Sequence, residues 1–471
     1  MRYRNQIGAW ESSRCEQTFS VFRTLNRMGQ TYSWAWVEAK VAQTIEIWNC
    51  SAARPPEAGK RYCPAEQQRC ERAYDEALKS VETEVKRAPK TKAARIETQN
   101  RIVASFARFS ANALGLEDDA TRLLTDDFLP VGATLARWAR RFDENLSMAG
   151  IIQACRNAWT ACGLQPLLGA PVQITPAIMG YSLLYPYSDN YLDDADVSAE
   201  EKLRFSERFR RLLRGEKLSG INHRERALYF LIGMIEDQYP RAQYPQVFES
   251  LLAIHRAQEQ SIAQPEIGSR CGDIEILRKS CAKGGSSVVA DACLVHGVLD
   301  ERESRFAFEW GVLLQLGDDL QDVREDMRRG AATLFSRAVA SGTPLDSLAI
   351  QLLNFGQEVG VTMDELPRGD GTLKALLKRS WRSLIVTAVA YSHEFFSTEF
   401  LKQAECCSPF RFEFLRERQA RLASRQGLYT MLFDIFLESA ESNGKEPQLS
   451  LVKRTHMERA IDLKTAASAR G

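Results

Sequence analysis

The chain has 471 residues, of which 44% are hydrophobic, and its 62 Lys and Arg side chains nearly balance 61 Asp and Glu. This length allows one large domain with appendages or a few domains, and the apolar fraction suffices for a buried core. The net charge of +1 gives no reason to expect nucleic acid or an anionic membrane as the main partner.

The first residues carry basic side chains but lack the apolar core of a secretory signal. No stretch approaches the roughly 18–20 apolar residues of a membrane helix. The eleven cysteines lack zinc-ligand spacing and lie mostly in apolar or mixed runs. We therefore expect a protein without a transmembrane segment in a reducing, cytoplasmic compartment.

Residues 10–50 carry apolar side chains at helical spacing, which predicts two or more short helices. Residues 51–100 are polar and contain Pro55-Pro56, which predicts an irregular stretch followed by a polar helix. Helix-length apolar segments then follow one another, among them 148–162, 176–194, 286–299, 304–327 and 373–396.

No strand–turn–helix rhythm and no fixed-period repeat interrupts this pattern, so the sequence predicts an all-α bundle. We divide the chain into an N-terminal helical and polar extension (1–94), a helical domain (95–440) and a polar tail (441–471).

A first acidic motif closes the apolar segment 176–194. Asp189 and Asp193 are four residues apart, so on a helix they differ by about 40° and share a face. Two like charges at this spacing destabilise a helix by a few tenths of a kcal/mol, which a bound cation would offset. The alternative is a helix end that runs into an acidic surface loop.

A second acidic motif closes the segment 304–327. Asp318, Asp322 and Asp326 follow at intervals of four and predict a stripe of carboxylates on one helix face. Acidic residues near a helix C-terminus oppose the helix dipole, where Lys or Arg would be favourable. The alternative is a solvated acidic face that pairs with neighbouring arginines.

The presence of two matching stripes favours a metal site over two unrelated acidic surfaces. Mg²⁺ takes oxygen ligands and is usually held by one or two carboxylates together with substrate phosphates. Two stripes that face each other across one cavity would hold Mg²⁺ against a diphosphate. The apolar bundle would shield a carbocation from water.

Residues 322–330 read DVREDMRRG, a DxxED pattern followed by a basic pair and glycine. This stretch resembles the second motif of the squalene/phytoene synthase branch of the class I isoprenoid synthases, and DNYLD at 189–193 resembles the first. KGGSSV at 283–288 resembles a signature of the bacterial tetraprenyl-β-curcumene synthases, a large-terpene synthase family. The resemblance covers residues 95–440 and is specific at these three stretches.

The resemblance implies a class I helical bundle with an N-terminal helical extension. It implies a terpene synthase that ionises a prenyl diphosphate with Mg²⁺, releases diphosphate, and cyclises or rearranges the carbocation. The catalytic residues would be Asp189, Asp193, Asp322 and Asp326, and Asp318 would join them as a metal ligand. A head-to-head prenyltransferase and a non-catalytic all-α binding protein are the alternatives. A homodimer is an open alternative for the assembly.

Six further residues are candidates for contacts with the diphosphate: Lys283, Ser286, Ser287, Arg224, Arg328 and Arg329. The 283–287 stretch would place a cation and backbone N–H groups at a helix N-terminus, or form a glycine hinge with a serine cap. The arginines suit phosphate geometry or form surface ion pairs. Arg425 and Tyr429, four residues apart, are a further candidate pair.

Overall fold

The computed structural model describes residues 31–52, 60–87, 90–194, 196–262, 267, 271–423, 427, 430–432 and 435–436. These residues form eighteen α-helices and no β-strand, which confirms the predicted all-α class. In this part of the chain, none of the helices has the length and apolar character needed to cross a membrane.

The helices of the N-terminal third are α2 (Trp34–Ser51), α3 (Pro64–Lys86), α4 (Lys92–Asn112), α5 (Asp118–Arg122), the π-helical turn η1 (Leu123–Phe128) and α6 (Leu129–Phe142). The middle third contains α7 (Met148–Leu167), α8 (Pro176–Asp193), α9 (Ala199–Leu213), α10 (His223–Gln238), α11 (Pro245–Ile262) and α12 (Asp273–His296). The C-terminal third contains α13 (Glu301–Gln321), α14 (Val323–Arg329), α15 (Leu334–Ala340), α16 (Asp346–Asp364), α17 (Gly371–Tyr391), the 3₁₀ turn η2 (His393–Phe395), α18 (Thr398–Glu405) and α19 (Phe412–Ala423).

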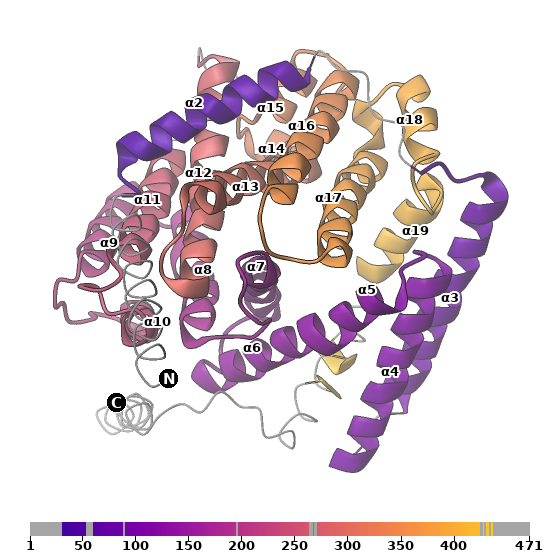
Figure 1. The fold of residues 1–471 in the computed structure, drawn as a ribbon, viewed down its shortest axis with the longest axis horizontal. Coiled ribbons are helices and arrows are strands. Elements are labelled where there is room, and N and C mark those ends of the chain that lie inside the picture. The colour runs from indigo at the N-terminus through magenta and orange to yellow at the C-terminus, as the bar shows by residue number, and fades with distance from the viewer. Residues whose placement is uncertain are drawn as a thin grey trace, which may run out of the picture.

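Helix α7 lies at the centre of the bundle, where it is seen nearly end-on in Figure 1. It packs against α6, α8 and α12, and its buried face is made of small residues such as Ala154, Ala158 and Ala161. Small side chains let neighbouring helices approach closely, so α7 can be surrounded on several sides. The central helix thereby brings α8 and α12 together on one side of the bundle.

Helices α12 and α13 pack closely against each other, and glycines are the reason. A Cβ atom on Gly284 would lie 2.5 Å from the carbonyl oxygen of Gly311, far inside van der Waals contact. A Cβ on Gly285 would lie 2.5 Å from the ring of Phe308. The two helix backbones therefore touch at this level.

This packing corrects the prediction for the KGGSSV stretch. We expected a helix start or a hinge near residue 286, but the stretch lies in the interior of α12. Glycine is unfavourable in a helix interior by about 1 kcal/mol relative to alanine, and here the close contact with α13 offsets that cost. Ser286 and Ser287 therefore neither cap a helix nor offer free backbone N–H groups to a phosphate.

The acidic helix ends also differ from the prediction. The expected single helix 304–327 is interrupted at Asp322, which is the C-cap of α13 and the N-cap of α14. The first motif ends its helix at Asp193, and Asp194 is the C-cap.

Helix α2 belongs to the main hydrophobic core, although it precedes residue 95. Its Trp48 packs edge-to-face on Phe355, with ring centroids 5.9 Å apart. Lys40 forms an ion pair with Glu301 at 2.5 Å. The division of the chain at residue 94 stays a prediction.

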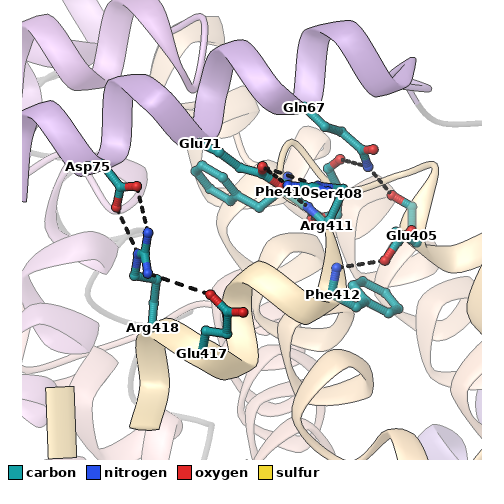
Figure 2. Close-up of polar contacts among 10 residues, drawn as sticks. All are labelled: Gln67, Glu71, Asp75, Glu405, Ser408, Phe410, Arg411, Phe412, Glu417 and Arg418. Atoms are coloured by element: carbon teal, nitrogen blue, oxygen red, sulfur yellow. Dashed lines mark hydrogen bonds and ion pairs between the residues drawn. The ribbon is translucent and has the colours of Figure 1, made fainter. Parts of the chain in front are cut away.

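Polar contacts fasten the α3–α4 hairpin to the C-terminal helices (Figure 2). The buried Glu71 carboxylate accepts hydrogen bonds from the Arg411 guanidinium at 2.6 and 2.9 Å and from its backbone N–H at 3.0 Å. Asp75 accepts two hydrogen bonds from Arg418, at 2.6 and 2.8 Å. We call these four residues the hairpin clamp.

Two small apolar clusters, separate from the main core, lie beside the clamp. One gathers Cys70, Ala113, Phe410 and Phe414. The other joins Val85, Ile102 and Ile435. The hairpin is thus held by the clamp and by these small clusters.

Candidate functional site

A cavity of about 2000 Å³ lies beside α7. Its walls come from α4, η1, α6 and α7, from α13, α16 and α17, and from the loop after α18. Its apolar lining residues include Phe106, Phe128, Ile152, Trp159, Trp310, Leu314, Leu377 and Phe410. Because small-molecule pockets usually measure about 300–1,000 Å³, this cavity is suited to a long or a double apolar ligand.

Several large apolar side chains are exposed because they line this cavity. Phe106, Ile152, Trp159 and Val361 are 41%, 48%, 40% and 55% exposed. Contiguous exposed apolar surface of this kind marks interaction sites and ligand-binding grooves. An apolar ligand in the cavity would remove these four side chains from water.

The wall formed by η1 and α7 is fixed by one indole. The Trp159 indole N–H donates to the carbonyl of Phe128 at 3.0 Å. A Cβ on Gly132 would lie 2.7 Å from the Trp159 ring, so the ring rests directly on the α6 backbone. Single π-helical turns occur frequently at functional sites, and this one places Leu124 and Phe128 in the lining.

Asp318 does not line the cavity, but it lies on α13 next to residues that do, and we call this region the rim. Leu314 and Gln321 line the cavity, and because they stand four before and three after Asp318 on α13, all three share a helix face. The Arg156 guanidinium of α7 pairs with the Asp318 carboxylate at 3.5 Å. The side chains are 50% and 46% exposed, so the pair is open to solvent.

The second acidic motif forms a group of carboxylates that share one electrostatic environment. Burial raises the pKa of Asp318 to about 6, the charges of Asp319 and Asp322 raise it further, and Arg156 opposes them. Burial likewise raises the pKa of Asp326 to about 7, again with contributions from Asp319 and Asp322. We call Asp318, Asp319, Asp322 and Asp326 the rim carboxylates.

Asp319 is the member of this group that the spacing argument missed. Its carboxylate accepts hydrogen bonds from the Gln315 side-chain amide at 2.8 Å and from the Ser280 hydroxyl at 2.9 Å. Burial raises its pKa, and these two hydrogen bonds together with Lys283 lower it in part. The Asp-Asp doublet at 318–319 was the available signal, but the doublet breaks the four-residue period.

The rim carboxylates fit Mg²⁺ in the chemistry of their donors. They are oxygen ligands, and the raised pKa values of Asp318, Asp319 and Asp326 reflect burial and the repulsion of neighbouring carboxylates, both of which a bound cation counteracts. Among the described residues, no set of three or more His, Cys, Asp or Glu side chains has metal-binding geometry. Mg²⁺ is usually held by one or two carboxylates together with phosphate and water, so a larger set is not required for it.

The first acidic motif lies at the end of α8, and its approach to the second motif stays a prediction. Asp189 is buried on α8 at 7% exposure, and the side chain of Asp193 lies outside the described residues. No described residue of α8 is among the residues that line this cavity.

Helix α12 is the structural link between the two motifs. The Tyr181 hydroxyl of α8 donates to the Ser287 carbonyl at 3.3 Å, and the charge of Asp189 contributes to the raised pKa of this tyrosine after burial and Asp291. One helical turn earlier, Lys283 acts on the pKa values of the rim carboxylates Asp318 and Asp319. The KGGSSV stretch thus lies between the two acidic motifs.

The predicted diphosphate-binding residues separate into two groups. Lys283 lies beside the rim carboxylates, and the buried Ser286 hydroxyl has no hydrogen-bond partner in the described part of the chain. Arg224 instead stacks on the ring of Tyr191 at 3.6 Å. Arg328 and Arg329 are each 69% exposed and pair with Glu325, so they form the surface ion pairs that were the alternative to phosphate contacts.

Arg156 is the cation that sequence reasoning missed at the rim, because nothing in the local sequence of α7 marks it. Arg425 and Tyr429 lie outside the described residues.

Neither models of known protein families nor curated proteins give a match to this chain. The site combines a large apolar cavity with acidic groups and two cations next to the part of its wall that α7 and α13 form.

Proposed function

We propose that this protein is a class I terpene synthase. It would ionise a prenyl diphosphate with the help of Mg²⁺, release diphosphate, and cyclise or rearrange the carbocation. The observation that carries the proposal is the group of rim carboxylates next to the α13 residues Leu314 and Gln321, which line a large apolar cavity. A prenyl diphosphate has the same two parts, a long apolar chain and a compact anionic head.

At the rim, Asp318, Asp322 and Asp326 would hold Mg²⁺, and Asp189 and Asp193 are the proposed ligands from the first motif. Bound Mg²⁺ neutralises the charge that develops on the leaving diphosphate. Lys283 adds a fixed positive charge next to the rim carboxylates. Because this lysine lies in the interior of α12, its backbone is held in place before the substrate arrives.

The cavity would do the remaining work through its lining. Apolar walls exclude water, which would otherwise capture a carbocation. Trp159 and Trp310 present aromatic rings to the cavity, and aromatic faces attract cations. The order of the reaction follows: the head is held at the rim, and the chain folds in the cavity.

The size of the cavity supports one second candidate, a head-to-head prenyltransferase that joins two prenyl diphosphates. At about 2000 Å³ the cavity has twice the volume of the largest ordinary small-molecule pockets, which run to about 1,000 Å³.

We also propose a reducing, cytoplasmic location. Every cysteine in the described residues is free, which fits such a compartment.

One incubation series distinguishes these functions. The protein is mixed with Mg²⁺ and prenyl diphosphates of graded chain length, and the released diphosphate and the extracted products are measured. A product that contains one prenyl chain supports a terpene synthase, and a product that contains two supports the transferase. Binding of the prenyl diphosphate without any diphosphate release would indicate a non-catalytic binding protein.

A further inference from the structure

Arg156 differs from the other arginines near the rim in what it contacts. Arg324 donates to the Tyr391 carbonyl and pairs with Glu394, and Arg328 and Arg329 share Glu325. Within the described residues, the ion-pair partner of Arg156 is Asp318, which is a proposed metal ligand. The cation and the metal would therefore compete for the same carboxylate.

We infer that Arg156 pairs with Asp318 in the metal-free protein. Once Mg²⁺ has replaced the guanidinium at the Asp318 carboxylate, Arg156 binds the substrate diphosphate. This inference rests on the proposed function. It adds a second diphosphate-binding cation and an order of events, in which metal binding frees the arginine.

The geometry of the pair makes the exchange feasible. The guanidinium and the carboxylate meet in one contact at 3.5 Å, and both side chains are about half exposed. Exposed pairs of this kind contribute little to stability, so a divalent cation can displace the arginine at small cost. A guanidinium can then donate two parallel hydrogen bonds to a phosphate group.

The position of Arg156 on α7 places it at the boundary between head and chain. Ile152 and Thr160, four residues to either side, line the cavity together with Trp159. The Asp318 carboxylate that Arg156 reaches also feels the positive charge of Lys283 of α12, and α7 packs on α12. A diphosphate at the rim would therefore lie between two cations from two adjacent helices.

The test uses Arg156→Gln and two probes, Mg²⁺ alone and inorganic pyrophosphate with Mg²⁺, each titrated by calorimetry. Loss of the competing cation should tighten binding of Mg²⁺ alone by about threefold. Loss of the phosphate donor should weaken pyrophosphate binding on the order of tenfold. Arg156→Lys should restore part of the pyrophosphate affinity, because it keeps the charge without the planar fork.

Arg204→Gln is the matched control, since Arg204 forms an exposed ion pair with Glu200 on α9, away from the rim. It should leave both affinities unchanged, and circular dichroism should show that every variant is folded. Unchanged affinities in Arg156→Gln, or a loss of both, would overturn the inference while leaving the proposed function intact. A wild-type protein that binds neither probe would refute the proposed function itself, and the inference with it.

Discussion

Replacing Asp326 by asparagine should stabilise the metal-free protein at high pH and leave it unchanged at low pH. Burial, with the charges of Asp319 and Asp322, raises the pKa of Asp326 from 3.8 to about 7. A carboxyl whose pKa is higher in the folded than in the unfolded chain favours folding below its unfolded pKa. That contribution is lost as the pH rises through the folded value.

The size of the effect follows from the shift. A shift of about three pKa units corresponds to at most about 4 kcal/mol, and solvent screening of this partly exposed side chain reduces it to about 2 kcal/mol. Since about 1 kcal/mol moves Tm by roughly 2–4 °C in chains half this long, we expect a rise of about 2–4 °C in this larger chain. Asparagine matches the shape of the neutral acid.

The assay is thermal unfolding in EDTA at pH 8 and near pH 4. Asp326→Asn should unfold at a higher temperature than the wild type at pH 8, and the two should coincide near pH 4. Asp119→Asn is the control, because Asp119 forms an exposed ion pair with Arg122, and its removal should bring no gain at either pH. An equal difference in unfolding temperature between variant and wild type at both pH values would refute the reasoning. A variant that unfolds at a lower temperature than the wild type at pH 8 would also refute it.

Three further predictions follow from the packing and from the rim. Gly284→Ala should destabilise the protein by about 1–3 kcal/mol in urea unfolding, because its Cβ would meet the carbonyl oxygen of Gly311. Arg411→Ala should lower stability by about 1.5–3 kcal/mol, because the buried Glu71 loses its charged donor; an unchanged urea midpoint would show that the hairpin clamp contributes nothing. Mg²⁺ with pyrophosphate should raise the Tm of the wild type but raise that of Asp322→Ala much less, and equal shifts would count against the metal site.

The helical class was predictable because apolar period and helix length are local properties of the sequence. The spacing of Asp318, Asp322 and Asp326 is likewise a local property, and the charges of Asp319 and Asp322 act on the pKa values of both Asp318 and Asp326, but their role as metal ligands stays a prediction. The break of the helix at Asp322 was not predictable from the sequence, because no glycine or proline marks it.

Other features depend on partners far along the chain. Gly284 fits a hinge and a close helix contact equally well until Gly311, 27 residues later, is known to face it. Arg156 belongs to the rim only because the fold brings it to Asp318, which follows it by 162 positions. The cavity itself is a property of many helices, and no local pattern of residues encodes its volume.

The measurement that tests the central claim most directly is diphosphate release from a prenyl diphosphate in Mg²⁺ buffer and in excess EDTA, by wild type and by Asp322→Ala. If the rim carboxylates hold Mg²⁺ against the leaving group, the wild type releases diphosphate in Mg²⁺ and loses that activity in EDTA. Asp322→Ala should lose most turnover in Mg²⁺ while its circular dichroism spectrum stays helical. Full release by the wild type in EDTA, or full release by the variant in Mg²⁺, would contradict the account.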